Sequence, residues 1–134
     1  MATANDVITA AGRRAAILAG EEAMTAAELA DGLTTLNDMM FGFRTQGIHY
    51  AHVALAAADT VNMPDELIDS LKWMMTDALV SDGYSVPLSP QQVTKITEAR
   101  QALQAAYKYI PPAPSPRGLL RNRPGQFFNI TRGE

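Results

Sequence analysis

Hydrophobic residues recur at helical spacing along most of the first 110 positions. Between residues 29 and 43, apolar side chains follow one another at intervals of four, three, four and three, at Leu29, Leu33, Leu36, Met40 and Phe43. Such spacing places them on one face of an α-helix. The same period is found over residues 4–18, 64–82 and 90–110. We therefore predict an all-α body of four helices.

The other three predicted helices have apolar faces of different width. The first carries Val7, Ile8, Ala11, Ala15 and Leu18. The third carries Leu67, Leu71, Met74 and Ala78, flanked by Ile68, Met75 and Leu79. The fourth carries Val93, Ile96, Leu103 and Tyr107. We expect these faces to meet in one core.

Residues that favour helix ends frame each segment. The predicted starts are Thr3 as an N-cap, the Thr25-Ala26-Ala27-Glu28 capping box, Pro64 as a first helical residue, and the Ser89-Pro90 pair. The predicted ends are Gly20, Gly47, Gly83 and Pro111-Pro112. Between the second and third helices, residues 48–63 have no helical stripe, and 48–55 alternate as an extended or short strand segment would. We expect a short irregular or β-like excursion there.

The net charge of −3 is divided unevenly along the chain. Residues 1–110 carry seven Lys and Arg and thirteen Asp and Glu, a net charge of −6, whereas residues 111–134 carry four Arg and one Glu, a net charge of +3. Five of the eight prolines also lie in 111–134, which prevents a helix and favours an extended chain. The sequence predicts a helical domain at 1–110 and an extended C-terminal arm at 111–134.

Composition narrows the class of protein. A chain of 134 residues is long enough for one independent core. It has no cysteine, so disulfides, thiolate metal sites and cysteine nucleophiles are excluded. No apolar run reaches the roughly 18 residues of a membrane span, and the first residues lack a basic region before an apolar one. We expect a soluble, unexported protein without a membrane span.

Few residues suggest catalytic or metal chemistry. Phosphate-binding glycine loops and the GxSxG motif are missing from the sequence. His49 and His52 could place two imidazoles on one side of a helical turn, but no third zinc ligand is positioned with them, so solvated or interface histidines are favoured. Glu21, Glu22 and Glu28 could be imagined as paired catalytic carboxylates, but the capping box already accounts for Glu28. We predict no catalytic residue, no cofactor and no metal.

The methionine pairs Met39-Met40 and Met74-Met75 are typical of core filler or of an adaptable interface between copies. The C-terminal arm combines arginines with apolar pairs, which a solvated linker would not need. Its predicted docking residues are Arg117, Leu119, Leu120, Arg121, Arg123, Phe127, Phe128 and Ile130. We favour a protein-docking arm over a nucleic-acid arm, because an acidic body would repel DNA; simple disorder is the third alternative.

Several short segments resemble one known family. Residues 11–21 (AGRRAAILAGE), 25–28 (TAAE) and 33–40 (LTTLNDMM) look like the N-terminal half of phage head-to-tail adaptor, or connector, proteins of the podovirus tail accessory factor family. Residues 59–67 (DTVNMPDEL) and 83–90 (GYSVPLSP) resemble that family's entries to helices three and four. The resemblance covers about residues 4–107 and departs from the family pattern at 41–43 and 48–58.

The resemblance implies a structural protein of the virion neck, made in the host cytoplasm. Members assemble beneath the portal protein, usually as a twelve-fold ring of copies, retain the packaged DNA and offer a platform to the next tail or nozzle protein. The C-terminal segment commonly reaches the portal, which would give residues 111–134 a role. Two alternatives stay open: a muralytic, peptidoglycan-cleaving virion enzyme, and a small DNA-binding regulator.

Overall fold

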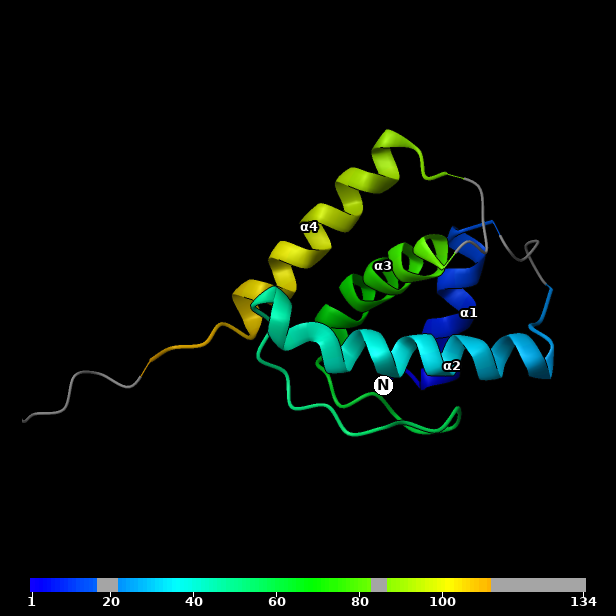
Figure 1. Ribbon diagram of the computed structural model, residues 1–134, viewed down its shortest axis with the longest axis horizontal. Helices are drawn as coiled ribbons and strands as arrows, with labels where there is room; N and C mark the ends of the chain where they lie inside the picture. Colours follow the sequence, from blue (N-terminus) through cyan, green and yellow to red (C-terminus); the bar gives the residue numbers. More distant parts are fainter. Residues whose placement is uncertain (17–21, 83–86, 112–134) are drawn as a thin grey trace, which may run out of the picture.

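The computed structural model describes residues 1–16, 22–82 and 87–111. These residues form four α-helices and one 3-10 helix (Figure 1): α1 (Ala4–Arg14), α2 (Ala26–Phe41), η1 (Gly42–Gln46), α3 (Asp65–Ser81) and α4 (Pro90–Ala106). The only β-pairing in this part of the chain is an isolated antiparallel bridge between Thr3 and Thr60. The predicted all-α fold class is therefore confirmed. None of the described helices is long and apolar enough to cross a membrane.

Capping boxes begin three of the four helices, at the residues that the sequence indicated. The hydroxyl of Thr25 accepts a hydrogen bond from the amide of Glu28 at 3.3 Å, while the Glu28 carboxylate accepts one from the amide of Thr25 at 2.9 Å. Thr3 and Asp6 make the same reciprocal pair in α1, and Ser89 and Gln92 make it in α4. Each box satisfies amides that the first helical turn leaves without a partner.

Three helix bounds differ from the predicted ones, and for two of them the backbone dihedral angles give the reason. The first helix ends at Arg14 and not at 18, since Ala16 has a left-handed φ of 59°, which a right-handed helix cannot include. Pro64 is the N-cap of α3 rather than its first helical residue, because its ψ of 142° is extended. The fourth helix ends at Ala106, short of the predicted 110. Gly20 and Gly83, the other predicted helix ends, lie outside the described residues.

Gly47 ends the second helical segment as predicted, with a left-handed φ of 79°. Before it, the α-helix tightens after Phe41 into η1. This tightening keeps Phe43 in the core, where its side chain is fully buried.

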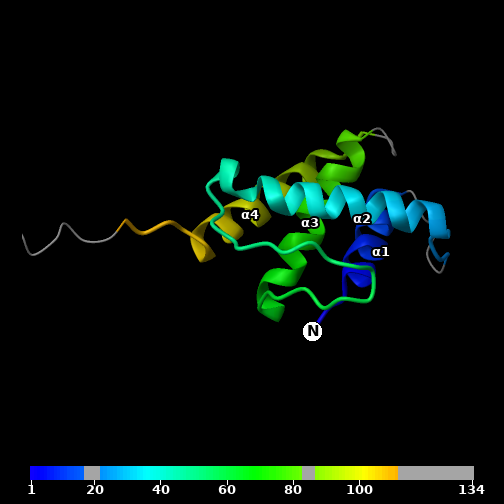
Figure 2. The same ribbon diagram turned by 60° about the horizontal axis from the view of Figure 1, so that its bottom comes forward.

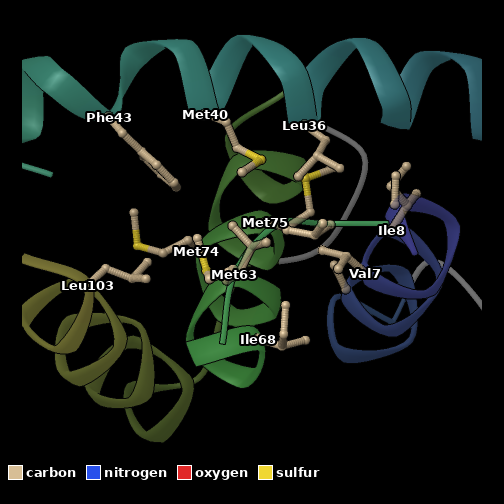
Figure 3. Packing of buried hydrophobic residues seen from close by; sticks show 14 of the residues in the cluster. Val7, Ile8, Leu36, Met40, Phe43, Met63, Ile68, Met74, Met75 and Leu103 are labelled. Carbon is tan, nitrogen blue, oxygen red and sulfur yellow. The ribbon is translucent and has the colours of Figure 1, made fainter. Parts of the chain in front are cut away.

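α3 is the central helix and packs against each of the other three. Figure 3 shows side chains from α1, α2, η1 and α4 meeting it. The helical members of this core include Val7, Ile8, Leu36, Met40, Phe43, Ile68, Leu71, Met74, Met75, Leu79 and Leu103. Met40, Met74 and Met75 are buried within one chain. Of the two alternatives for the methionine pairs, these three residues are core filler and do not face another copy.

The predicted face of α4 is partly wrong. Ile96 and Leu103 are buried as predicted, but Val93 is 50% exposed, and α4 also buries Ala99. The three buried positions share one helix face, and the small Ala99 side chain allows α4 to approach α3 closely.

Gly32 sets the distance between α1 and α2. A Cβ atom at this position would lie 2.7 Å from Cγ2 of Ile8, which is fully buried. Any other residue would therefore push the two helices apart or displace Ile8.

The excursion, residues 48–63, runs beneath α2 and returns to the start of α3 (Figures 1 and 2). At its far end, the carbonyl oxygens of Ala57 and Asp59 accept hydrogen bonds from the amides of Asn5 and Ala4, at 3.0 and 2.9 Å. These are first-turn amides of α1, which have no partner inside the helix. The segment forms no strand because its backbone groups bond to helix ends rather than to a neighbouring strand.

Candidate functional site

A row of aromatic and imidazole rings joins the end of α2, the excursion and the end of α4. We call it the ring ladder; its members are Phe41, His52, Tyr50, Tyr107, His49 and Tyr109. Ring centroids lie 4.6 Å apart for Phe41 and His52, 6.2 Å for His52 and Tyr50, 5.2 Å for Tyr50 and Tyr107, and 5.1 Å for His49 and Tyr109. The amide of His49 also donates to the carbonyl of Tyr107 at 2.9 Å. Three segments distant in sequence thus meet through these rings.

Asn37, on α2, holds His52 of the ladder and the neighbouring backbone of Leu55 in place. Its Oδ1 accepts from the amide of Leu55 at 2.9 Å, and its Nδ2 donates to the carbonyl of Leu55 at 3.1 Å. Oδ1 also lies 2.9 Å from Nε2 of His52. Because Oδ1 can only accept, Nε2 of His52 carries the hydrogen and donates it. Burial lowers the pKa of His52, so the imidazole is held neutral with one defined tautomer.

A cavity of about 270 Å³ opens beside this anchor. It is lined by Met40, Phe41, Arg44, Tyr50 and His52. The Tyr50 hydroxyl donates to the carbonyl of Asn62 at 2.9 Å, and burial raises the pKa of both Tyr50 and Tyr107, so these phenols stay protonated at neutral pH. The cavity has mixed polar and apolar walls, is lined largely by rings, and includes one exposed cation, Arg44.

The two ends of the ladder are open to solvent. Phe41 is 55% exposed and Tyr109 is 57% exposed, although both are large apolar rings. Arg44 and Lys108 lie beside them in the sequence and are also exposed. Exposed rings next to exposed cations are typical of an interaction surface.

The predicted docking residues of the arm, Arg117, Leu119, Leu120, Arg121, Arg123, Phe127, Phe128 and Ile130, lie outside the described residues. Their role stays a prediction. In the described chain, α4 ends at Ala106, and residues 108–111 are exposed, with Ile110 at 80%.

His49 and His52 belong to the ladder but contact different rings, Tyr109 and Phe41. Residues 1–16, 22–82 and 87–111 contain no group of three side chains that could hold a metal ion. Of the three glutamates considered for catalysis, Glu28 is engaged in its capping box and Glu21 lies outside the described residues. Glu22 is exposed on the chain before α2.

A second polar cluster joins α1, α3 and α4. The guanidinium of Arg14 lies over the ring of Trp73, 4.3 Å from its centroid, and bonds to the carboxylate and the carbonyl of Asp69. Gln92 donates from Nε2 to the carbonyl of Arg14 at 3.0 Å. A broad open cavity of about 720 Å³ lies beside Trp73. The bonds in this cluster link helices, which indicates a structural role.

Sequence reasoning singled out the two histidines but missed Asn37, Phe41 and Tyr109 as their partners. One signal was available: residues 39–58 and 99–133 contain no Asp or Glu, and most aromatic residues of the body fall within them. That these two stretches meet in space follows only from the fold.

Comparison of the chain with family models, with curated proteins and with solved structures finds no match.

Proposed function

We propose that the chain is a structural head-to-tail connector of a tailed phage, without catalytic activity. Copies assemble as a ring beneath the portal protein, retain packaged DNA and support the next tail protein. The C-terminal arm, residues 111–134, docks on the portal. The family resemblance of residues 4–107 motivates this proposal.

One structural observation carries it: the chain leaves the body on the surface. After α4, residues 108–111 are exposed and lead away from the helices (Figure 1). The arm that follows therefore starts outside the hydrophobic core of the described residues, which extends from Ala2 to Tyr107. An arm attached in this way can reach a partner while the body remains folded.

The composition of the arm fits a protein groove with an acidic rim. Arg117, Arg121 and Arg123 can each form two parallel hydrogen bonds to a carboxylate, and Phe127-Phe128 can fill an apolar pocket. Ordering such a segment costs conformational entropy, which only a bound partner offsets. We therefore expect the free protein to be monomeric and the ring to form on the portal.

Co-sedimentation with isolated portal rings tests the proposal. The full-length protein should pellet with the rings, and Arg117→Glu/Arg121→Glu/Arg123→Glu should lose most of that binding. Arg13→Glu is the matched control, since Arg13 is an exposed arginine on α1. If the triple variant kept full binding, or if the control lost as much binding, the claim that the arm docks on the portal would be contradicted.

A turbidity assay on cell walls separates the connector from the muralytic alternative. The connector should not clear peptidoglycan. Clearing by the wild-type protein that is abolished in Glu21→Gln, Glu22→Gln or Glu28→Gln would overturn the absence of catalysis that we propose.

A further inference from the structure

We infer that the ring ladder is a binding site for single-stranded nucleic acid. This function goes beyond the proposed connector role and does not depend on it, because it rests on the folded body alone. The distribution of charge and the exposure of the rings point to this ligand.

The charge of the body is segregated, although its sum is acidic. All thirteen acidic residues of 1–110 lie outside 39–58 and 99–110, the two stretches that build the ladder. Hydrogen bonds join these stretches: His49 donates to the carbonyl of Tyr107, and Gln104 donates to the carbonyl of Gln46. These two stretches therefore supply cations and no acids, although Asp77 of α3 reaches Arg100.

Arg44 and Lys108 are exposed cations of these stretches. Arg100 is less available, because it pairs with Asp77 at 3.4 Å. Asp38, the acid closest in sequence to Phe41, lines a different cavity together with Asp77 and Arg100. Arg44 and Lys108 can thus meet phosphate groups without a competing carboxylate from the ladder.

Each of these cations is close to an exposed ring, Arg44 in the cavity and Lys108 in the sequence. Arg44 lines the cavity with Phe41, Tyr50 and His52, while Lys108 directly precedes Tyr109, whose ring packs against His49. In single-stranded nucleic acid, a phosphate follows every base, and unpaired bases stack on aromatic side chains. We therefore expect one base to stack on Phe41 and another on Tyr109, with Arg44 and Lys108 binding the adjoining phosphates.

The cavity beside Phe41 is small and its walls are fixed. Its volume of about 270 Å³ is just below the range of about 300–1,000 Å³ that is usual for drug-sized ligands. The ring of Phe41 stands edge-on to His52 with an interplanar angle of 76°, and Asn37 fixes His52, so the walls are formed before a ligand arrives.

These features favour a single strand over a duplex or an acidic protein. The bases of a duplex are stacked on one another and cannot stack on Phe41 or Tyr109. An acidic protein segment would pair with Arg44 and Lys108 but would supply no flat ring for the exposed aromatic faces. Unpaired nucleotides use both features of the ladder, because each one carries a flat ring and a phosphate.

Fluorescence anisotropy with the full-length protein and a labelled oligothymidylate of about 20 nucleotides tests the inference at about 50 mM salt. Phe41→Ala/Tyr109→Ala should raise the Kd about 10- to 100-fold and leave its salt dependence unchanged. Arg44→Glu/Lys108→Glu should raise the Kd and also reduce the salt dependence. The matched control is Val93→Ala, which removes an equally exposed apolar side chain from the far end of α4 and should leave the Kd unchanged.

Circular dichroism and urea unfolding establish that both double variants are folded, which is expected because Phe41 and Tyr109 are more than half exposed and Arg44 and Lys108 are exposed. The inference is overturned by any of three results: no oligothymidylate binding by the wild type, an unchanged Kd in the ring variant, or binding of a duplex or a polyglutamate peptide as tight as that of the single strand. Phe41→Ala/Tyr109→Ala should still co-sediment with portal rings. The nucleic-acid inference can therefore fail without affecting the connector proposal, which co-sedimentation tests separately.

Discussion

The side-chain oxygen of Asn37 lies 2.9 Å from Nε2 of His52 and 2.9 Å from the amide nitrogen of Leu55. One residue of α2 thereby holds the middle of the excursion, which has no secondary structure of its own to stabilise it. The same contact orients His52 against Phe41 and so shapes the cavity of the ring ladder.

Asn37→Ala should lower the free energy of unfolding by about 1–3 kcal/mol, because it leaves both backbone groups of Leu55 and the Nε2 hydrogen of His52 without their partner. Urea unfolding followed by circular dichroism measures the change. Thr34→Ala is the control, since Thr34 is exposed on the same helix and its hydroxyl bonds only within that helix. Similar losses in the two variants would contradict an anchoring role for Asn37.

Stability should depend on the ionisation of His52. Burial lowers the pKa of this imidazole in the folded protein, so below the ordinary pKa of about 6.5 the unfolded chain binds more protons than the folded one. The stabilisation is complete above that value and is lost as the pH falls through the lower folded pKa. Asp6 contributes in a different window, because hydrogen bonds from Thr3 lower the pKa of its carboxyl from an already acidic value.

The measurement compares urea midpoints of the wild type and His52→Gln from about pH 7.5 to about pH 5. The wild type should lose stability on acidification more steeply than the variant, which has no titrating group at this position. Parallel pH profiles would show that protonation of His52 does not oppose folding.

Residue patterns within each segment predicted most of the helices. The predicted helix ends were wrong where those patterns carry no information about the backbone. Thr25 and Glu28 are three positions apart and cap one helix, so the sequence alone identifies the box. Nothing near Ala16 indicates its left-handed backbone, which ends α1 early. The face of α4 was misassigned because packing against α3 decides whether Val93 or Ala99 points inward.

The candidate site was harder to predict for the same reason. Asn37 and Leu55 are 18 positions apart, and His49 bonds to Tyr107, so the ladder exists only once α2, the excursion and α4 are assembled. Periodicity assigns Asn37 to a polar helix position and nothing more. The sequence identifies the two histidines as candidate functional residues, but it does not identify the side chains that they contact.

Gly32→Ala should destabilise the protein by about 1–2 kcal/mol, although alanine favours a helix by up to about 1 kcal/mol over glycine. The added methyl group would lie 2.7 Å from Cγ2 of the buried, β-branched Ile8, which cannot move without disturbing the contact of α1 with α2. Gly42→Ala is the control: no atom lies within 4 Å of the added Cβ and its φ of −76° suits alanine, so it should be neutral or slightly stabilising. Thermal or urea unfolding of both variants gives the comparison, and stabilisation by Gly32→Ala would refute the proposed close approach.

Arg14→Ala should lower the free energy of unfolding by about 1–2 kcal/mol, the sum of a cation–π contact and a partly exposed ion pair. The substitution removes the guanidinium from the face of Trp73 and from Asp69, and thereby loosens the contact of α1 with α3. Trp73 is the only tryptophan of the chain, so its fluorescence reports this site directly; we expect a red shift as water replaces the guanidinium. Arg13→Ala, one position away on the exposed side of α1, should change stability by less than about 0.5 kcal/mol and leave the emission unchanged. If instead both variants behave alike, Arg14 contributes only general surface charge, and the link between α1 and α3 rests on their apolar packing.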